Sequence, residues 1–323
     1  MELRKVQETG GGTFLVSLPK DWAKRSALSR GSFVTLVERG DGCLVIDPAR
    51  QPEQLTETTV LVSSGLEREI TGKYLLGYDV IKVETEGRIR PEDRETVKTT
   101  CRRLVGLEVI EEDARRIVMQ CLLEPSALTP EKVLRREHLI ASGMHKEAVA
   151  ALLESDERLA RSVFERDEEV NRLYFLLVRL LRTVIQHPPL SEQLKISPID
   201  CLDLRLVASL VEGISDSAAE IAWYVYKFPK APLPSSLLRQ IAKLSELAYE
   251  IHEKAMKSVF ARDFQLAMSI ISVPVEIKTI LTEVEGALTK LPPDLLTHAS
   301  AIVSCLKRIY EYGMDIADLV MPE

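Results

Sequence analysis

The chain has 323 residues, a length that predicts two or three domains instead of one. Hydrophobic residues make up 46% of the chain and charged residues 28%, as in ordinary globular proteins. The net charge of −7 excludes a generally basic nucleic-acid coat protein. The charge is uneven, because residues 1–50 carry eight Lys and Arg against six Asp and Glu. This permits a small basic module attached to an acidic body.

The cysteines and the apolar segments set the expected compartment. The five cysteines are far apart and form no CxxC pair, so we expect buried, reduced thiols. The N-terminus lacks the apolar core of a signal peptide. The most apolar segment, residues 173–185, is interrupted by Arg179 and Arg182 and is too short to span a bilayer. We therefore expect a cytoplasmic protein that is not embedded in a membrane.

Residues 1–50 alternate between apolar and polar side chains and predict four short strands, at Glu2–Gln7, 13–18, 33–38 and 43–47. A short helix is predicted after Pro19, ending before Gly31. The three glycines at 10–12 do not form a nucleotide-binding loop, because a strand follows them where such a loop needs a helix. Fifty residues bury too little surface to be stable alone, so we expect a partner chain to complete this unit.

Residues 55–125 change pattern and predict the order strand, helix, strand, helix, strand, strand. The predicted strands are 60–64, 79–85, 107–112 and 116–123, and the predicted helices are 66–77 and 91–106. This order indicates a small α/β sandwich with its helices on one face of the sheet. The segment contains no nucleophile, metal cluster or glycine fingerprint, so we expect a structural or hinge role.

Residues 129–323 are predicted to form about six helices in two sets of three, at about 129–229 and 233–323. A shift of 107 residues places 144–148 on 251–255 and Asp156 on Asp263. The last helix of each set matches at a shift of 95 residues. We interpret these matches as a duplicated three-helix unit, and the repeated SVF-x-RD phrase at 162 and 258 as a coincidence.

Acidic residues at helical spacing are the candidate chemistry of this part. In the first copy they are Asp167 and Asn171 on one helix and Glu212, Asp216 and Glu220 on another, and the second copy keeps Glu311 and Asp315. Carboxylates that face each other across a bundle can bind hard or borderline cations. A solvated acidic face is the alternative interpretation. The second copy is poorer in ligands, with Pro274, Lys278 and Lys307 opposite Asp167, Asn171 and Glu212.

The helical part resembles PhoU, a phosphate-uptake regulator built from two three-helix bundles, in FERDEEVNRLYFLLVR (164–179), LVEGISDSAAEIA (210–222) and their degenerate copies. That resemblance implies iron or zinc at Asp167-xxx-Asn171, Glu212-xxx-Asp216 and Glu311-xxx-Asp315. Residues 1–50 resemble the AbrB/MazE/SpoVT swapped-hairpin domain in GGTFLVSLPKDWAKR, RGSFVTLVE and DGCLVI. The combined order is similar to archaeal proteins described as phosphate uptake regulators.

Together these features predict a multidomain α+β protein with an N-terminal swapped-hairpin β-barrel, a small α/β sandwich and two C-terminal three-helix bundles. We expect a homodimer through residues 1–50 that binds DNA and responds to phosphate. Its candidate DNA contacts are Arg4, Lys5, Lys20, Lys24, Arg25 and Arg30.

Two other functions compete with this one. The alternative is an adaptor that does not bind DNA and regulates a phosphate transporter or a sensor kinase. A carboxylate-bridged metal enzyme is disfavoured, because the bundle has no Glu-x-x-His pair. We therefore do not expect an enzyme.

Overall fold

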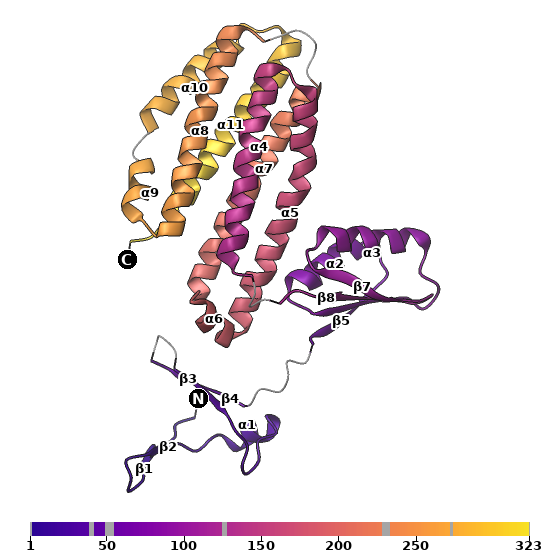
Figure 1. Ribbon diagram of the computed structural model, residues 1–323, viewed down its shortest axis with the longest axis vertical. Coiled ribbons are helices and arrows are strands. Elements are labelled where there is room, and N and C mark those ends of the chain that lie inside the picture. Colours follow the sequence, from indigo (N-terminus) through magenta and orange to yellow (C-terminus); the bar gives the residue numbers. More distant parts are fainter. Residues whose placement is uncertain are drawn as a thin grey trace. The chain divides into compact units, whose positions relative to one another are not determined.

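The computed structural model describes residues 2–38, 42–48, 55–124, 128–227, 233–271 and 274–322 (Figure 1). The chain divides into two compact units, Met1–Leu55 and Thr56–Glu323. The domain limits predicted at residues 50, 125 and 229 fall outside the described residues. In the described part, no helix combines the length and the apolar character that crossing a bilayer requires.

The first unit contains four short strands and one helix: β1 (Gln7–Glu8), β2 (Phe14–Leu15), α1 (Lys20–Arg25), β3 (Thr35–Glu38) and β4 (Leu44–Asp47). β1 pairs with β2 and β3 pairs with β4, each antiparallel and each in a sheet of its own. β1 overlaps the predicted strand Glu2–Gln7 only at Gln7, so that prediction was wrong for residues 2–6. The described residues of the single chain form no closed sheet. Gly12 lies in the turn between β1 and β2, and its φ of +76° is a conformation that glycine adopts easily.

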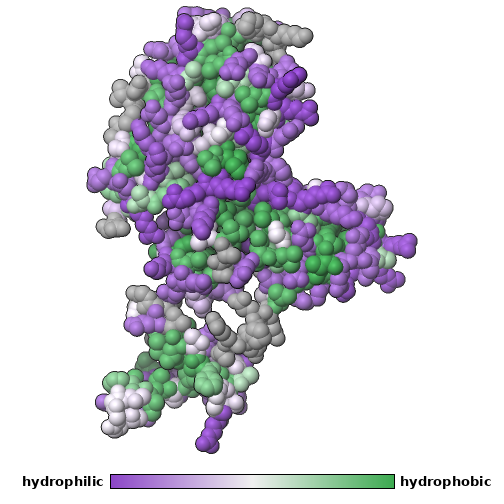
Figure 2. Space-filling model, viewed as in Figure 1, coloured by the Kyte–Doolittle hydropathy of each residue, from purple (hydrophilic) through white to green (hydrophobic). Residues whose placement is uncertain are grey.

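Apolar side chains of this unit face solvent. Among its described residues none is buried. Figure 2 shows hydrophobic surface over this part of the chain. The exposed large apolar residues are Leu3, Val6, Phe14, Leu15, Val16, Phe33, Leu36 and Leu44. Two isolated hairpins without a core are marginal structures in water, so this unit needs a further surface to cover its apolar side chains.

The second unit begins with a four-stranded sheet and two helices. Its elements are β5 (Glu57–Leu61), α2 (Leu66–Leu75), β6 (Val80–Glu84), α3 (Pro91–Arg103), β7 (Leu107–Glu112) and β8 (Arg116–Cys121). This is the predicted order of strands and helices. The strand order is β5-β6-β8-β7, with β5 parallel to β6 and the other pairs antiparallel. Both helices cover the same face of the sheet, as predicted (Figure 1), and one apolar cluster fills the space between.

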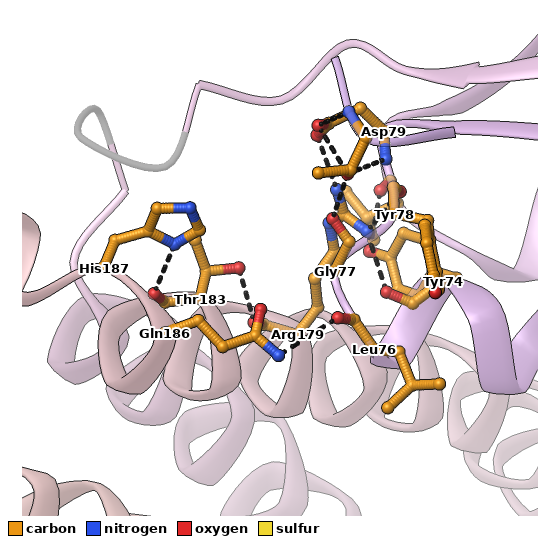
Figure 3. Close-up of polar contacts among 11 residues, drawn as sticks. Tyr74, Leu76, Gly77, Tyr78, Asp79, Arg179, Thr183, Gln186 and His187 are labelled. Carbon is orange, nitrogen blue, oxygen red and sulfur yellow. Dashed lines mark hydrogen bonds and ion pairs between the residues drawn. The ribbon is translucent and has the colours of Figure 1, made fainter. Parts of the chain in front are cut away.

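The sheet region is fixed to the long helix α5 (Glu157–Gln186) through the side chain of Arg179 (Figure 3). Its Nη1 donates to the carbonyl oxygens of Tyr74 and Tyr78, both at 2.8 Å, and its Nη2 lies 3.3 Å from Asp79 Oδ1. The guanidinium carbon also lies 5.0 Å from the centre of the Tyr74 ring. Arg179 is only 5% exposed, and these partners satisfy its buried charge.

The remaining helices form the predicted two sets. The first set is α4 (Pro130–Glu154), α5, the short α6 (Pro188–Leu194) and α7 (Pro198–Lys227). The second set is α8 (Ser235–Ala261), α9 (Phe264–Ile271), α10 (Pro274–Leu288) and α11 (Pro293–Asp318). A single apolar core joins both sets. The second set thus has two helices where the first has the unbroken α5.

The ends of two pairs of helices have the same geometry at a spacing of 107 residues. Ser155 after α4 and Arg262 after α8 both adopt the left-handed conformation, with φ of 55° and 51°. Asp156 then accepts hydrogen bonds from the first turn of α5, and Asp263 accepts one from Leu266 N at the start of α9. The same backbone turn is therefore built twice at the predicted spacing.

The cysteines follow the division into two units. Cys101, Cys121, Cys201 and Cys305 are buried, as expected, whereas Cys43 is exposed. Its exposure is a consequence of its position in the first unit, whose described residues enclose no core. The expectation of a buried thiol was wrong at this position.

Candidate functional site

The predicted acidic residues of the first repeat lie on two helices that pack together. Asp167 is on α5, and Glu212 is on α7. Asn171 Nδ2 donates to Asp167 Oδ2 at 3.0 Å, and Ser215 Oγ lies 3.5 Å from Asp167 Oδ1. Both helices also contact α4. The site is therefore a seam between three helices, with Asp216 at its solvent edge.

Glu137 on α4 joins this group and was missed in the sequence. Its side chain is fully buried, and neither carboxylate oxygen has a hydrogen-bond partner. Glu137 lies on the face of α4 that also carries the buried Leu134 and Ala141. A charged residue at a position where the helix pattern expects an apolar one is the sequence feature that could have revealed it. Its equivalent in the second repeat, 107 residues later, is the buried Leu244.

The pKa values of all four acidic side chains, Glu137, Asp167, Glu212 and Asp216, are raised. Burial is the largest cause at each of them. It raises the pKa of Asp167 to about 6 and that of Glu212 to about 7, and neighbouring carboxylates add to both shifts. Burial and the charge of Glu212 raise the pKa of Glu137 well above its usual range, whereas Arg205 opposes that shift. The site therefore holds more negative charge than its surroundings neutralise.

This arrangement suits a cation or, without one, protons. A buried carboxylate without a hydrogen-bond partner is costly, and either a proton or a positive ion removes that cost. Carboxylate oxygens suit hard and borderline metal ions, which agrees with the expected iron or zinc. In the described residues, however, the only His, Cys, Asp or Glu triplet with ligand atoms all within 4.8 Å is His138, His252 and Glu253. A single ion shared by three of the four carboxylates would therefore require them to move closer together.

Other predicted ligands lie outside this cluster. Glu220 forms an ion pair with Arg308 of α11, so its charge is already matched. Glu311 is exposed and lies 3.8 Å from Lys307 Nζ, and Asp315 is also exposed. The second repeat thus places its acidic residues at the surface, without a buried counterpart of Glu137.

The predicted DNA contacts in the first unit are all exposed. Lys20, Lys24 and Arg25 lie on α1, and Arg30 follows it. Arg4 pairs with Glu2 and also lies 3.3 Å from Ser17 Oγ. Arg4 is thus partly neutralised within its own segment.

Comparison with known proteins identifies the helical part. A family model described as the PhoU domain matches residues 134–225, which cover most of α4 and α7 and all of α5 and α6. No curated protein sequence matches the chain.

Two solved structures share the fold. PhoU from Pseudomonas aeruginosa is 20% identical, with a TM-score of 0.50, and the match covers 59% of this chain and 93% of that one. The phosphate transport system regulatory protein PhoU from Streptococcus pneumoniae is 16% identical, with a TM-score of 0.50 and coverage of 59% and 91%. The chain is therefore PhoU-like, as its helical motifs predicted. The resemblance of residues 1–50 to the AbrB/MazE/SpoVT domain stays a prediction.

Proposed function

We propose that this PhoU-like protein is a signalling adaptor that regulates phosphate uptake by binding a phosphate transporter component or a sensor kinase. The proposal is carried by the location of the carboxylate cluster within the PhoU-like segment. The segment that matches the PhoU domain also contains all four carboxylates of the buried cluster. The family assignment supports the regulatory role, and the cluster supplies a site through which an ion could stabilise the partner-binding form.

In this proposal iron or zinc binds at the carboxylate cluster. Glu137, Asp167, Glu212 and Asp216 are the candidate ligands, and the carbonyl oxygen of Asn171 is a further donor because its amide nitrogen already bonds Asp167. An ion offsets the mutual repulsion of these acidic groups and the cost of burying Glu137, and it joins α4, α5 and α7. The same ion would exclude protons from these carboxylates.

The adaptor role is tested by capture from cells grown with abundant and with scarce phosphate. The full chain should retain a phosphate transporter subunit or a sensor kinase, identified by mass spectrometry. The double variant Glu212→Gln with Asp216→Asn should retain several-fold less of it. A control pair on the exposed face of α11, Glu311→Gln with Asp315→Asn, should behave as the unaltered chain. Retention of neither kind of partner would contradict the adaptor role.

A DNA-binding regulator is the second candidate, favoured by the exposed cations and exposed apolar residues of the first unit. A second copy of the chain is the occupant we propose for that apolar surface, because two hairpins from each copy could close a barrel that one copy leaves open. The test is the oligomeric state in analytical ultracentrifugation. Phe33→Ser with Leu36→Ser should convert a dimer into a monomer, and a dimer that survives this change would contradict the proposal.

DNA binding has its own measurement. Six cations per chain, doubled in a dimer, set an upper limit of about −11 for the slope of log affinity against log salt. Lys20→Ala with Arg25→Ala removes four of these twelve charges and should reduce the slope by about 4. An affinity that is indifferent to salt and to this double change would exclude the DNA-binding candidate and leave the adaptor.

A further inference from the structure

A second polar group is buried where the two repeats meet, away from the carboxylate cluster. It lies between α4 and α8, the equivalent first helices of the two sets. His138 Nε2 is 3.3 Å from His252 Nδ1, and His252 Nε2 is 3.2 Å from His145 Nδ1. Ser245 Oγ is 3.1 Å from His145 Nε2, which closes one end of the chain of side chains. All three imidazoles are at least nine-tenths buried.

The other end of this chain holds a carboxylate. Ser142 Oγ donates to Glu253 Oε1 at 2.8 Å and lies 3.2 Å from His138 Nε2. Glu253 Oε1 is 3.8 Å from His138 Nε2, which is too long for a hydrogen bond between them. The carboxylate thus faces a ring nitrogen without binding it directly.

The 107-residue shift relates the two halves of this polar group. The 107-residue shift superposes His145 on His252, and His138 on Ser245. The contact between His145 and Ser245 is therefore the repeat-related equivalent of the contact between His252 and His138. One half of a symmetric arrangement has a serine where the other half has an imidazole. The same shift pairs Lys146 with Glu253, so only one half has an acidic neighbour.

Three donor atoms in the half that contains His138 lie as close together as a metal site requires. One ligand atom each from His138, His252 and Glu253 lies within 4.8 Å of the other two. Two nitrogens bound to one tetrahedral Zn²⁺ at about 2.0–2.1 Å are about 3.3 Å apart, the separation of His138 Nε2 and His252 Nδ1. We propose that His138, His252 and Glu253 bind a divalent transition-metal ion of the zinc class between the two repeats.

The surrounding side chains provide the outer partners such a site needs. When His252 binds metal through Nδ1, its Nε2–H donates to His145 Nδ1, and His145 Nε2–H donates to Ser245 Oγ. Ser142 fixes Glu253 by donating to Oε1. Each of these hydrogen bonds has one donor and one acceptor, so one tautomer of each histidine satisfies the whole chain.

The histidines are also in the protonation state that binds metal. Burial lowers the pKa of His138 and of His145 to about 4, and that of His252 well below its usual range. The charged groups nearby are Glu253, which opposes the shift at His138, and Lys146, which adds to the shifts at His145 and His252. Neutral imidazole is the ligand form, so no proton has to leave at neutral pH.

The backbone around His252 is held close to another helix. A Cβ added to Gly313 of α11 would lie 3.0 Å from the backbone nitrogen of His252 and 2.8 Å from Ile251 Cγ2. α11 therefore packs directly behind the segment that carries His252 and Glu253. An ion bound there would join α4 of the first repeat to α8 of the second, whose other side packs on α11.

The test is Zn²⁺ binding to the full chain after chelator dialysis, followed by competition with a chromophoric zinc indicator. Co²⁺ serves as a second probe, because tetrahedral nitrogen and oxygen ligands give it visible absorption bands. His138→Ser should weaken binding at this site at least about 100-fold and remove the Co²⁺ bands. Serine is the matched replacement, because Ser245 occupies the equivalent position in the second repeat. Helix content by circular dichroism should be unchanged.

Three further variants separate binding at this site from binding elsewhere on the chain. Glu253→Gln, at a partly exposed position that tolerates change, should also remove the Co²⁺ bands. His145→Gln, an outer partner, should weaken binding by roughly 10- to 100-fold without removing the bands. Glu212→Gln with Asp216→Asn should leave the Co²⁺ bands intact, and any Zn²⁺ that this double variant loses belongs to the carboxylate cluster. The decisive measurement is made in the Glu212→Gln, Asp216→Asn background, where tight Zn²⁺ binding that survives both His138→Ser and Glu253→Gln, or no Zn²⁺ binding before those changes, would overturn the proposal.

Discussion

The two helical repeats have the same backbone turns and different chemistry. Each begins with a long helix that ends in a left-handed residue, followed by an aspartate that caps the next helix. The first repeat then continues through the unbroken α5, whereas the second divides the same segment into α9 and α10. Glu137 is buried in the first repeat, and its equivalent in the second is Leu244. The helix ends and apolar positions specify the fold, and the charged cluster is an addition to one copy.

The division of the second repeat has a simple cause. Proline has no backbone N–H and disfavours a helical residue before it, so it is tolerated at a helix start and not inside one. Pro274 is the first residue of α10, and its equivalent, Asp167, lies in the middle of α5. The same position therefore begins a helix in one copy and carries a candidate ligand in the other.

The largest expected change in stability comes from placing proline, the residue of the second repeat, at position 167 of the first. Asp167→Pro removes an N–H inside α5 and should lower the free energy of unfolding by at least about 3 kcal/mol. Urea unfolding followed by far-ultraviolet circular dichroism measures it. Asp167→Ala is the control for loss of the side chain alone, and Pro274→Ala should cost much less because α10 begins there. If Asp167→Pro and Pro274→Ala lowered the free energy of unfolding equally, the explanation from the position of proline in each helix would be wrong.

A smaller effect of opposite sign is expected at Glu137. Glu137→Leu copies the second repeat and removes a buried carboxyl without a hydrogen-bond partner, so it should raise the free energy of unfolding by about 1–3 kcal/mol. The measurement is urea unfolding in the presence of a chelator. Glu137→Gln is the control, because it keeps a buried polar group and should gain little. A Glu137→Leu protein less stable than the original would show that the carboxyl has a partner in solution.

The stability that Glu137→Leu adds should depend on pH. The pKa of Glu137 is raised in the folded protein, so the unfolded chain releases this proton at a lower pH than the folded chain. The stability linked to the bound proton is therefore complete below about pH 4.5 and is lost as the pH rises towards the folded pKa. The advantage of Glu137→Leu over the original should therefore grow as the pH rises above about 4.5 towards the folded pKa. The buried histidines contribute the opposite trend below about pH 6.5 in both proteins, so the difference between the two proteins isolates Glu137. An advantage that shrinks with rising pH would contradict this assignment.

The smallest expected effects should be equal in the two repeats. Asp156→Ala and Asp263→Ala each remove a helix cap and should each cost about 1 kcal/mol. The urea midpoint of each single variant measures the cost, and asparagine at either position should restore most of the loss. A cost confined to one repeat would show that the shared turns are not equivalent in energy.

Much of this fold could be predicted, because its signals are local. The order of strands and helices from β5 to β8 followed from alternation, from Pro91 and from Gly106. The 107-residue repeat could be read from matching letters around Asp156 and Asp263. The start of α10 at Pro274 could have been expected, because proline favours the first turn of a helix.

What sequence reasoning missed depends on side chains that meet across long separations. His138 and His252 are 114 residues apart and meet only because α4 packs on α8. Glu137 has no acidic residue three or four positions away on α4, so it forms no motif of helical spacing in the sequence. In the first unit, alternation predicted four strands, but closure of those strands depends on pairing that one chain does not show in its described residues.

The helix α5 contributes to the carboxylate cluster and also contacts the sheet region. Asp167 and Arg179 lie on the same helix, 12 residues and therefore about 18 Å apart. Arg179 is held by two carbonyl oxygens of the sheet region, and Gln186 reaches a third at Leu76. A displacement of α5 at the carboxylate cluster would therefore act on the sheet region through Arg179 and Gln186.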